Sequence, residues 1–205
     1  MQKKVELSIV VLSYNTTDLL KDCLDSLEKV KDEVNFEVIV VDNDSTDGSP
    51  EMIKNNYSYV HLIQKNKNVG FAAGNNSARN VVNGEYVLLL NSDTIVEKNT
   101  LRETLKYLKG ARDIGALTCK LVLPNGDLDK DARRSFITPW VGLTHLVLKL
   151  DRLFPKSKTF SQYWYGYESP DKIHEVDVIQ GAYFLTRKKV LDEVSWFDED
   201  YFLDG

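Results

Sequence analysis

Short apolar runs alternate with segments of helical spacing over the first 120 or so residues, and this alternation constrains the fold most strongly. Leu7–Leu12 is a run of the kind that a buried parallel strand shows, and apolar residues then recur at helical spacing from Leu19 to Val30. Three more apolar runs follow at Phe36–Val41, Tyr59–Ile63 and Tyr86–Leu90. The alternation predicts a mostly parallel sheet flanked by helices on both faces.

Turn and cap residues predict where the intervening helices begin. Helix starts are expected at Thr16-Thr17-Asp18, at Ser49-Pro50-Glu51, at Phe71 for a helix to Val82, and at Thr100, whose pairing with Glu103 fits a capping box. A strand over Ile114–Leu123 is expected to enter a turn at Pro124-Asn125-Gly126.

Three of the predicted strands end in polar clusters, which are Ser13-Tyr14-Asn15, Asp42-Asn43-Asp44 and Asn91-Ser92-Asp93. Because such sheets bind ligands at the carboxyl ends of their strands, we expect the clusters to converge on one crevice. A carboxylate such as Asp93 can bind Mg²⁺ or Mn²⁺, which prefer oxygen ligands and share them with phosphates. Each cluster by itself is also explained as a turn or a capped helix start.

The pattern changes after about residue 127. The pair Arg133-Arg134 suits a diphosphate or an acidic acceptor, although a solvated basic pair is the simpler interpretation. The segment from Trp140 to Leu150 is apolar and is followed by basic residues up to Lys158. A core helix is the commoner explanation for such a segment, and a helix lying on a membrane surface is the alternative.

Composition and missing motifs exclude several classes of protein. The net charge is −5 and no long basic run occurs, so nucleic-acid binding is not expected. Three histidines and two cysteines show no zinc-ligand spacing, and Cys23 and Cys119 are expected to be free thiols. Neither a dinucleotide fingerprint nor a phosphate loop is present. No apolar run approaches the roughly 20 residues needed to span a bilayer, and we expect a cytoplasmic chain.

Taken in order, the motifs resemble those of the family 2 glycosyltransferases, which have the GT-A fold, and within them the bacterial rhamnosyltransferase-like branch. The resemblance covers nearly the whole chain and is carried by Ser8–Asn15, Val40–Asn43 with Ser45, Asp47, Gly48 and Ser49, Asn68–Phe71 with Gly74–Asn76, Leu89–Asp93, Gly115-Ala116, Arg133-Arg134, Gly181-Ala182 and Trp196–Glu199. It implies a Rossmann-like domain over residues 1–205, with a nucleotide-sugar-binding half over 1–127 and an acceptor-side lobe over 128–205.

The resemblance also implies roles for individual residues. The donor site is expected to comprise Ser13, Tyr14, Asn15, Asp42, Asn43, Asn68, Gly70, Asn75, Asn91, Ser92, Asp93 and Arg134. Asn91-Ser92-Asp93 looks like this branch's form of the family's Asp-x-Asp motif, with Asp93 meeting Mg²⁺ or Mn²⁺ and the diphosphate. Asn91 replaces the first acid of that motif, which leaves fewer charges on the metal.

The reaction implied is a single in-line displacement at the donor's anomeric carbon, with inversion. Similar enzymes take the catalytic base from a Glu-Asp pair, which is expected just beyond Gly205, and Asp204 is the candidate within the sequence. We therefore expect this chain to bind its donor but to transfer sugar poorly. The donor is expected to be dTDP-rhamnose or a UDP- or GDP-sugar. The acceptor is expected to be a surface polysaccharide or a lipid-linked sugar, reached by peripheral contact with the inner face of the cell membrane.

Two other functions remain open from the sequence. The chain would be a non-catalytic nucleotide-sugar-binding module if donor bound without transfer. A sugar nucleotidyltransferase would usually carry a glycine-rich loop with a basic residue after the first strand, where this sequence has Ser13-Tyr14-Asn15-Thr16.

Overall fold

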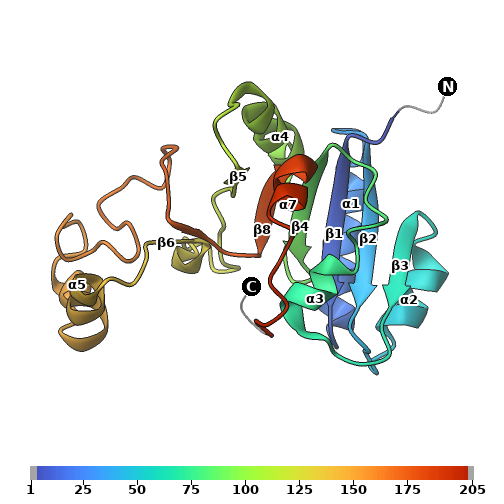
Figure 1. Ribbon diagram of the computed structural model, residues 1–205, viewed down its shortest axis with the longest axis horizontal. Helices are drawn as coiled ribbons and strands as arrows, with labels where there is room; N and C mark the ends of the chain where they lie inside the picture. Colours follow the sequence, from blue (N-terminus) through green and yellow to red (C-terminus); the bar gives the residue numbers. More distant parts are fainter. Residues whose placement is uncertain (1–3, 203–205) are drawn as a thin grey trace. The chain divides into compact units, whose positions relative to one another are not determined.

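The computed structural model describes residues 4–202 (Figure 1). The chain forms two compact units: Met1–Leu117 together with Gly181–Gly205 make the first, and Thr118–Gln180 make the second. The functional division expected after residue 127 stays a prediction.

The first unit contains a six-stranded, mostly parallel sheet with the strand order β3-β2-β1-β4-β8-β5. Its strands are β1 (Leu7–Ser13), β2 (Phe36–Asp42), β3 (Val60–Gln64), β4 (Tyr86–Asn91), β5 (Ala116–Leu117) and β8 (Tyr183–Arg187). Strands β1 to β4 run parallel to one another, while β8 is antiparallel to both β4 and β5. The predicted α/β class with a mostly parallel sheet is confirmed.

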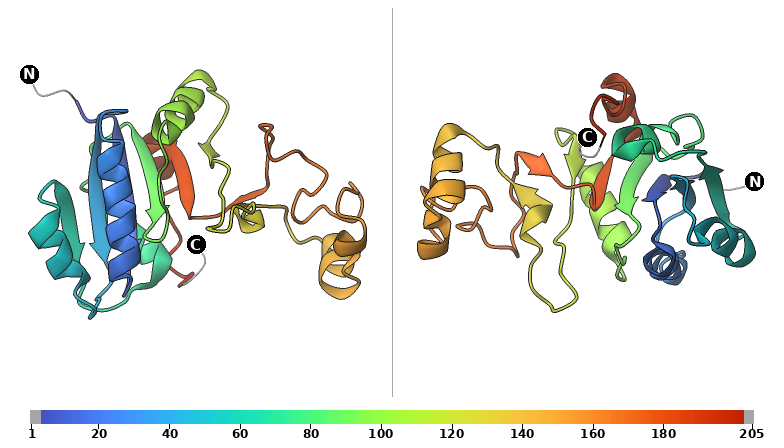
Figure 2. Two further views of the ribbon diagram at one scale, coloured as in Figure 1. Left: turned by 180° about the vertical axis from the view of Figure 1, so that it is seen from behind. Right: turned by 90° about the horizontal axis from the view of Figure 1, so that it is seen from below.

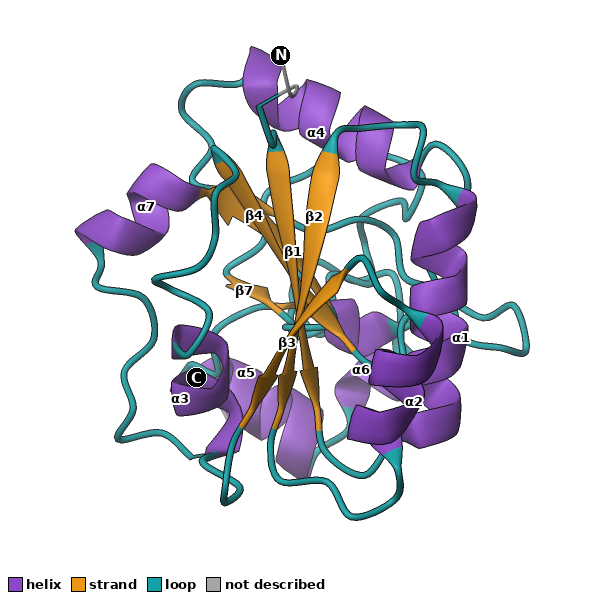
Figure 3. Cartoon of the chain, turned by 90° about the vertical axis from the view of Figure 1, so that its right-hand side faces the viewer, coloured by secondary structure: helices purple, strands orange, loops and turns teal. Residues whose placement is uncertain are grey.

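Helices cover both faces of this sheet (Figures 2 and 3). The helices of this unit are α1 (Thr17–Lys29), α2 (Ser49–Asn56), α3 (Gly70–Asn76), α4 (Thr100–Gly110) and α7 (Lys188–Glu193). Helices α3 and α7 lie on one face, and α1, α2 and α4 lie on the other. Because successive side chains of a strand point to opposite faces, both faces of the central strands are apolar and buried.

One core cluster shows how the strands and helices pack. Val10 of β1 and Leu89 of β4 lie in a cluster with Ala78, Leu191 and Trp196, all of them 5% exposed or less. These residues come from β1, β4, α7 and the segments that follow α3 and α7. The part of the first unit that follows residue 181 therefore packs against strands from the beginning of the chain.

Three local predictions were wrong. Helix α3 ends at Asn76, and turns follow it, because the N–H groups of Ala78 and Arg79 donate to carbonyls three residues back instead of four. Strand β5 has only two residues, because only Ala116 and Leu117 pair with β8. Helix α4 begins at Thr100, after Asn99 in a left-handed conformation, so Thr100 is not its cap.

The second unit contains short elements, which are a 3₁₀ turn (Lys130–Ala132), β6 (Arg133–Arg134), α5 (Pro139–Gly142), a π-helical turn (Leu143–Val147), α6 (Leu150–Leu153) and β7 (Val178–Ile179). β6 pairs antiparallel with β7. A helix does form within the predicted range, since α5 and the π-helical turn run together over 139–147 and Lys149 follows with a φ of 50°. Its interpretation as a core helix is wrong, because most of its apolar side chains are exposed. Within residues 4–202, no helix has both the length and the apolar character needed to cross a bilayer.

Candidate donor-binding site

The three polar clusters lie at one edge of the sheet. In the register of the parallel strands, Ser13 pairs with Asp42, and Leu12 pairs with Asn91. The arrowheads of these strands lie close together in Figure 3. The structure therefore brings the clusters after β1, β2 and β4 together at the carboxyl edge, where ligands of such sheets bind.

The loop after β1 is tied to the loop after β2. Asn15 N–H donates to Ser45 Oγ at 2.9 Å, and the Asn15 Oδ1 atom accepts from Thr46 N–H at 2.8 Å. Asn15 adopts a φ of 52°, a left-handed conformation that Asn tolerates better than most residues. Asn15 thus shapes this corner of the site, and the neighbouring Tyr14 ring is left exposed at its edge.

A chain of hydroxyl groups connects the loop after β1 to the loop after β4. The Ser13 and Thr16 hydroxyl oxygens lie 3.0 Å apart, and Thr16 Oγ1 donates to Ser92 Oγ at 3.0 Å. Thr16 precedes the first residue of α1, but its hydroxyl makes no capping bond to that helix. The predicted cap is therefore only positional, because the Thr16 hydroxyl is used to fix Ser92.

Asp47 caps two helices from the loop after β2. One carboxylate oxygen accepts from Thr17 N–H at 2.8 Å, at the start of α1. The other accepts from Ser49 N–H at 3.1 Å and from the Ser49 hydroxyl at 2.6 Å, at the start of α2. Burial alone would raise the pKa of Asp47, but the hydrogen bonds from Ser49 and Thr17 outweigh it and lower this pKa to about 2.

We expect Asp47→Ala to lower the free energy of unfolding by about 1–2 kcal/mol, the usual cost of losing a helix cap. Since the pKa of this carboxyl is lowered in the folded protein, its contribution is complete above the ordinary pKa and is lost as the pH falls from about 4 to about 2. The stability difference between wild type and variant, measured by urea unfolding, should shrink over that interval. A difference that does not change with pH would contradict this assignment. The control is Asp44→Asn in the same loop, since Asn tolerates the φ of 71° at that position.

Asn43 and Asn75 use their side chains to build the site. Asn43 Nδ2 donates to Asn68 Oδ1 at 3.0 Å and to Gly70 O at 3.1 Å, and its Oδ1 accepts from Val69 N–H at 3.2 Å. Asn75 Nδ2 donates to the carbonyl of Phe71 at 3.0 Å. Both asparagines are buried. The Asn43 contacts fix the loop before α3 against the end of β2, whereas the Asn75 bond stays within α3.

The segment Phe197–Phe202 lies against α3. Phe71 N–H donates to Phe202 O at 2.7 Å, while the Asn76 side chain donates to Phe197 O at 2.9 Å and accepts from Phe197 N–H at 3.1 Å. Gly70 has a φ of +83°, and a Cβ atom there would overlap the Phe202 carbonyl oxygen. The approach of this segment therefore requires glycine at position 70.

We expect Gly70→Ala to lower the free energy of unfolding by at least about 2 kcal/mol, because a left-handed alanine costs about 1–2 kcal/mol and the overlap with Phe202 adds to it. Limited proteolysis should also cut the segment after Trp196 faster in the variant. Gly110→Ala is the control, since nothing lies within 4 Å of its Cβ position at the end of α4. Equal urea midpoints for wild type and Gly70→Ala would refute the proposed close approach.

The end of β4 presents Asp93 as an exposed carboxylate. Asn91 N–H and the Thr94 hydroxyl both donate to Ala182 O at 3.2 Å, which fixes the turn that carries Asp93. Burial, with a smaller contribution from the charge of Asp93, raises the pKa of the Cys23 thiol to about 12. Cys23 is therefore a neutral thiol, and both cysteines are free, as predicted.

Asp42 is almost fully buried at the end of β2, with 1% of its surface exposed. Its Oδ2 atom accepts from Ser45 N–H at 3.2 Å, but its Oδ1 atom has no hydrogen-bond partner among the described residues. A buried acceptor without a partner is costly. A hydrogen-bond donor on a ligand would satisfy this oxygen.

The residues at Asp93 fit a divalent cation that is shared with a ligand. Within residues 4–202, no three His, Cys, Asp or Glu side chains gather in a group that would hold a metal ion. An exposed carboxylate with few neighbours is the arrangement in which Mg²⁺ takes one protein ligand and completes its shell with phosphates and water. The site therefore suits a metal–diphosphate pair.

Arg134 and Asp204 stay predictions. Arg134 belongs to β6 of the second unit, where its Nε atom is buried without a partner among the described residues. Burial lowers the pKa of the neighbouring Arg133 guanidinium. The Arg133 Nη1 atom lies 3.2 Å from His174 Nε2. Asp204, the candidate base, lies outside the described residues.

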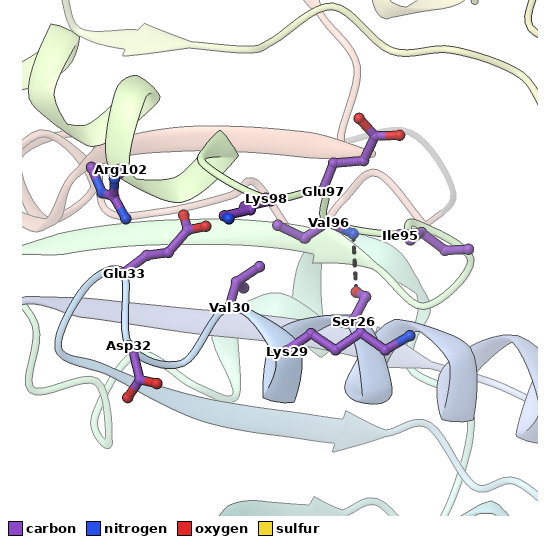
Figure 4. A pocket seen from close by; sticks show the side chains of 10 residues that line it. All are labelled: Ser26, Lys29, Val30, Asp32, Glu33, Ile95, Val96, Glu97, Lys98 and Arg102. Atoms are coloured by element: carbon purple, nitrogen blue, oxygen red, sulfur yellow. Dashed lines mark hydrogen bonds between the residues drawn. The ribbon is translucent and has the colours of Figure 1, made fainter.

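A cavity of about 680 Å³ opens elsewhere in the first unit, and no predicted site residue lines it (Figure 4). It is lined by Ser26, Lys29, Val30, Asp32, Glu33, Ile95, Val96, Glu97, Lys98 and Arg102. Its three basic and three acidic side chains favour no single sign of charge. We assign no ligand to this cavity.

Sequence reasoning missed the structural role of Thr16, Ser45 and Asp47, whose contacts hold the three loops in place. The only signal was their position in polar loops directly after strands, and such residues are also common in ordinary turns.

Comparison with protein families agrees with this geometry. The family model described as Glycosyl transferase family 2 matches residues 8–195. The chain belongs to this family. Among its curated relatives, a poly(ribitol-phosphate) beta-glucosyltransferase of Bacillus spizizenii is 34% identical over 110 residues, which are 51% of this chain and 17% of that protein.

Solved GT-A structures share the fold. The mannosyltransferase PcManGT from Pyrobaculum calidifontis, in complex with GDP-Man and Mn²⁺, gives a TM-score of 0.63 at 18% identity, over 97% of this chain and 49% of that one. TarS 1–349 of S. aureus, in complex with UDP, gives a TM-score of 0.61 at 21% identity, over 97% of this chain and 52% of that one. The predicted GT-A fold is confirmed, and the chain spans about half of these structures and less than half of the curated relatives it matches.

Proposed function

We propose that this family 2 protein is an inverting, metal-dependent glycosyltransferase that takes its sugar from a nucleotide donor bound at the ends of β1, β2 and β4. The observation that carries the proposal is the register that pairs Ser13 with Asp42 and Leu12 with Asn91, so that the three strands end together. Asp93 follows β4 as an exposed residue. The complexes of related folds with GDP-Man and with UDP support a nucleotide-sugar donor. Following the rhamnosyltransferase-like motifs, we propose dTDP-rhamnose, with a UDP- or GDP-sugar as the other candidate.

Each part of the site has a task in this reaction. Asp42 accepts a hydrogen bond from the base or ribose, while Asn15 and Asn43 hold the loops that surround the nucleotide. Asn75 lies beside them in α3. A divalent cation bound at Asp93 would neutralise charge on the departing diphosphate. The acceptor hydroxyl attacks the anomeric carbon in line and loses its proton to a base, for which Asp204 stays a prediction.

The proposed acceptor is a growing surface polysaccharide or a lipid-linked sugar, reached from the cytoplasm by peripheral contact with the inner face of the membrane. The named activity of the Bacillus spizizenii relative on poly(ribitol-phosphate) supports a polymeric surface acceptor. Arg134 is proposed to contribute to the donor's diphosphate site.

Thermal-shift screening tests the proposed donor. Nucleoside diphosphates and nucleotide sugars are added with and without Mn²⁺, and free rhamnose serves as a control. A ligand at about 100 times its Kd stabilises the folded protein by about 2.7 kcal/mol, or roughly 5–10 °C for a chain of this size. The largest shift identifies the donor base. The proposal fails if no nucleoside diphosphate raises the melting temperature in the presence of Mn²⁺.

A further inference from the structure

An exposed apolar segment lies in the second unit. Six large apolar side chains within it are each more than half exposed: Phe136, Ile137, Leu146, Val147, Leu148 and Leu153. We call residues 136–153 the apolar segment; it contains α5, the π-helical turn and α6. Scattered exposed apolar residues are ordinary, but so many within one short segment mark a contact surface.

Other residues of the apolar segment, which are buried or hydrogen-bonded, stabilise its fold without these six side chains. Val141 and Thr144 are buried, and the Thr144 hydroxyl donates to Trp140 O at 2.9 Å. His145 Nδ1 lies 2.9 Å from Asp151 Oδ2, and the His145 ring stacks on Tyr163 with centroids 4.3 Å apart. The outer apolar side chains are therefore available for a partner.

The charges around the apolar segment indicate which partner it fits. Four exposed basic residues lie in or directly after it, at Lys149, Arg152, Lys156 and Lys158. Between residues 136 and 158 the one acid is Asp151, whose side chain is 10% exposed and is engaged by His145. This concentration of positive charge lies in a chain whose net charge is −5. Apolar side chains with adjacent cations match an anionic lipid surface.

We propose that the apolar segment docks on an anionic lipid bilayer, with its apolar side chains at the boundary between headgroups and acyl chains and its cations on the lipid phosphates. The inference deepens the proposed function by naming the surface and the lipid class, and rests on that function for its location in the cell. The contact itself requires no donor.

Vesicle co-sedimentation of the whole chain tests the apolar part of the contact. The wild type should sediment with phosphatidylglycerol vesicles, and Val147→Ser with Leu153→Ser should weaken this binding about a hundredfold, since burying each side chain is worth about tenfold. The matched control is Ile95→Ser with Val194→Ser, two similarly exposed apolar residues of the first unit. Quenching of Trp140 fluorescence by brominated lipids, absent in Trp140→Phe, should report insertion.

Charge is tested separately. Arg152→Gln with Lys156→Gln should weaken binding about thirtyfold, because each basic residue near an anionic membrane contributes about fivefold. Lys54→Gln with Lys106→Gln, exposed basic residues of the first unit, should have little effect. Phosphatidylcholine vesicles, or about 1 M salt, should bind much less protein.

Three results would overturn the inference: wild-type protein that stays in the supernatant, equal binding by the Val147→Ser, Leu153→Ser variant, or equal binding to both lipids. A dimer in solution that this variant converts to monomer, with no vesicle binding, would identify the segment as an interface between copies. Nucleotide-induced thermal shifts should be the same in all these variants, so the failure of the inference and of the proposed donor site are distinguishable.

Discussion

Asp93→Asn should weaken the binding of the donor's nucleoside diphosphate in the presence of Mn²⁺ by at least about a hundredfold. The Asp93 carboxylate is exposed at the end of β4, and no group of three His, Cys, Asp or Glu side chains within residues 4–202 can replace it as a metal site. Even residues that only support metal ligands typically change metal affinity by 10–100-fold, and a direct ligand should have at least that effect. Isothermal titration calorimetry with and without Mn²⁺ measures the difference.

Measuring nucleotide binding without metal tests whether Asp93 acts through the metal ion. Without a divalent cation, the wild type and Asp93→Asn should bind the nucleotide with similar affinity, since the variant loses a metal ligand and keeps the loop. Asp113→Asn removes an exposed acid before β5 and should behave like the wild type. Mn²⁺-dependent binding that survives in Asp93→Asn would remove this residue from the metal site and leave the nucleotide pocket itself untested by that result.

The strands of the first unit were predictable because burial on both faces leaves a continuous apolar run. Leu7–Ser13 and Tyr86–Asn91 are visible in the sequence for this reason, and the polar residues that end them mark the binding edge. The loop contacts were not predictable. Thr16 was expected to cap α1, but its hydroxyl bonds to Ser92, which is 76 positions away, and no local pattern encodes such a contact.

The second unit was harder to predict for a different reason. The spacing from Trp140 to Leu150 fits a core helix, but the helical stretch that forms over 139–147 leaves most of its apolar side chains exposed. A hydrophobic pattern shows that side chains avoid water, but it does not say whether protein or another surface covers them. The place of the antiparallel strand β8 between β4 and β5 depends on pairing over long sequence distances.

Asp42→Asn should weaken nucleotide binding without lowering the free energy of unfolding. In the wild type, the Oδ1 atom of a carboxylate that is 1% exposed has no hydrogen-bond partner among the described residues, which opposes folding. Removing the charge should leave the free energy of unfolding unchanged or raise it by about 1 kcal/mol. A hydrogen bond to a charged group is worth about 1.5–3 kcal/mol, so nucleotide affinity should fall about 10- to 150-fold.

Asp44→Asn is the matched control for this experiment, because it makes the same change two residues away, where the side chain is exposed and Asn tolerates the φ of 71°. Urea unfolding and calorimetry on both variants give the two quantities. A loss of stability of 2 kcal/mol or more in Asp42→Asn, with nucleotide affinity unchanged, would assign Asp42 to the architecture of the loop through Ser45. Lower affinity at equal or higher stability would mean that the protein keeps a costly buried carboxylate because the nucleotide uses it.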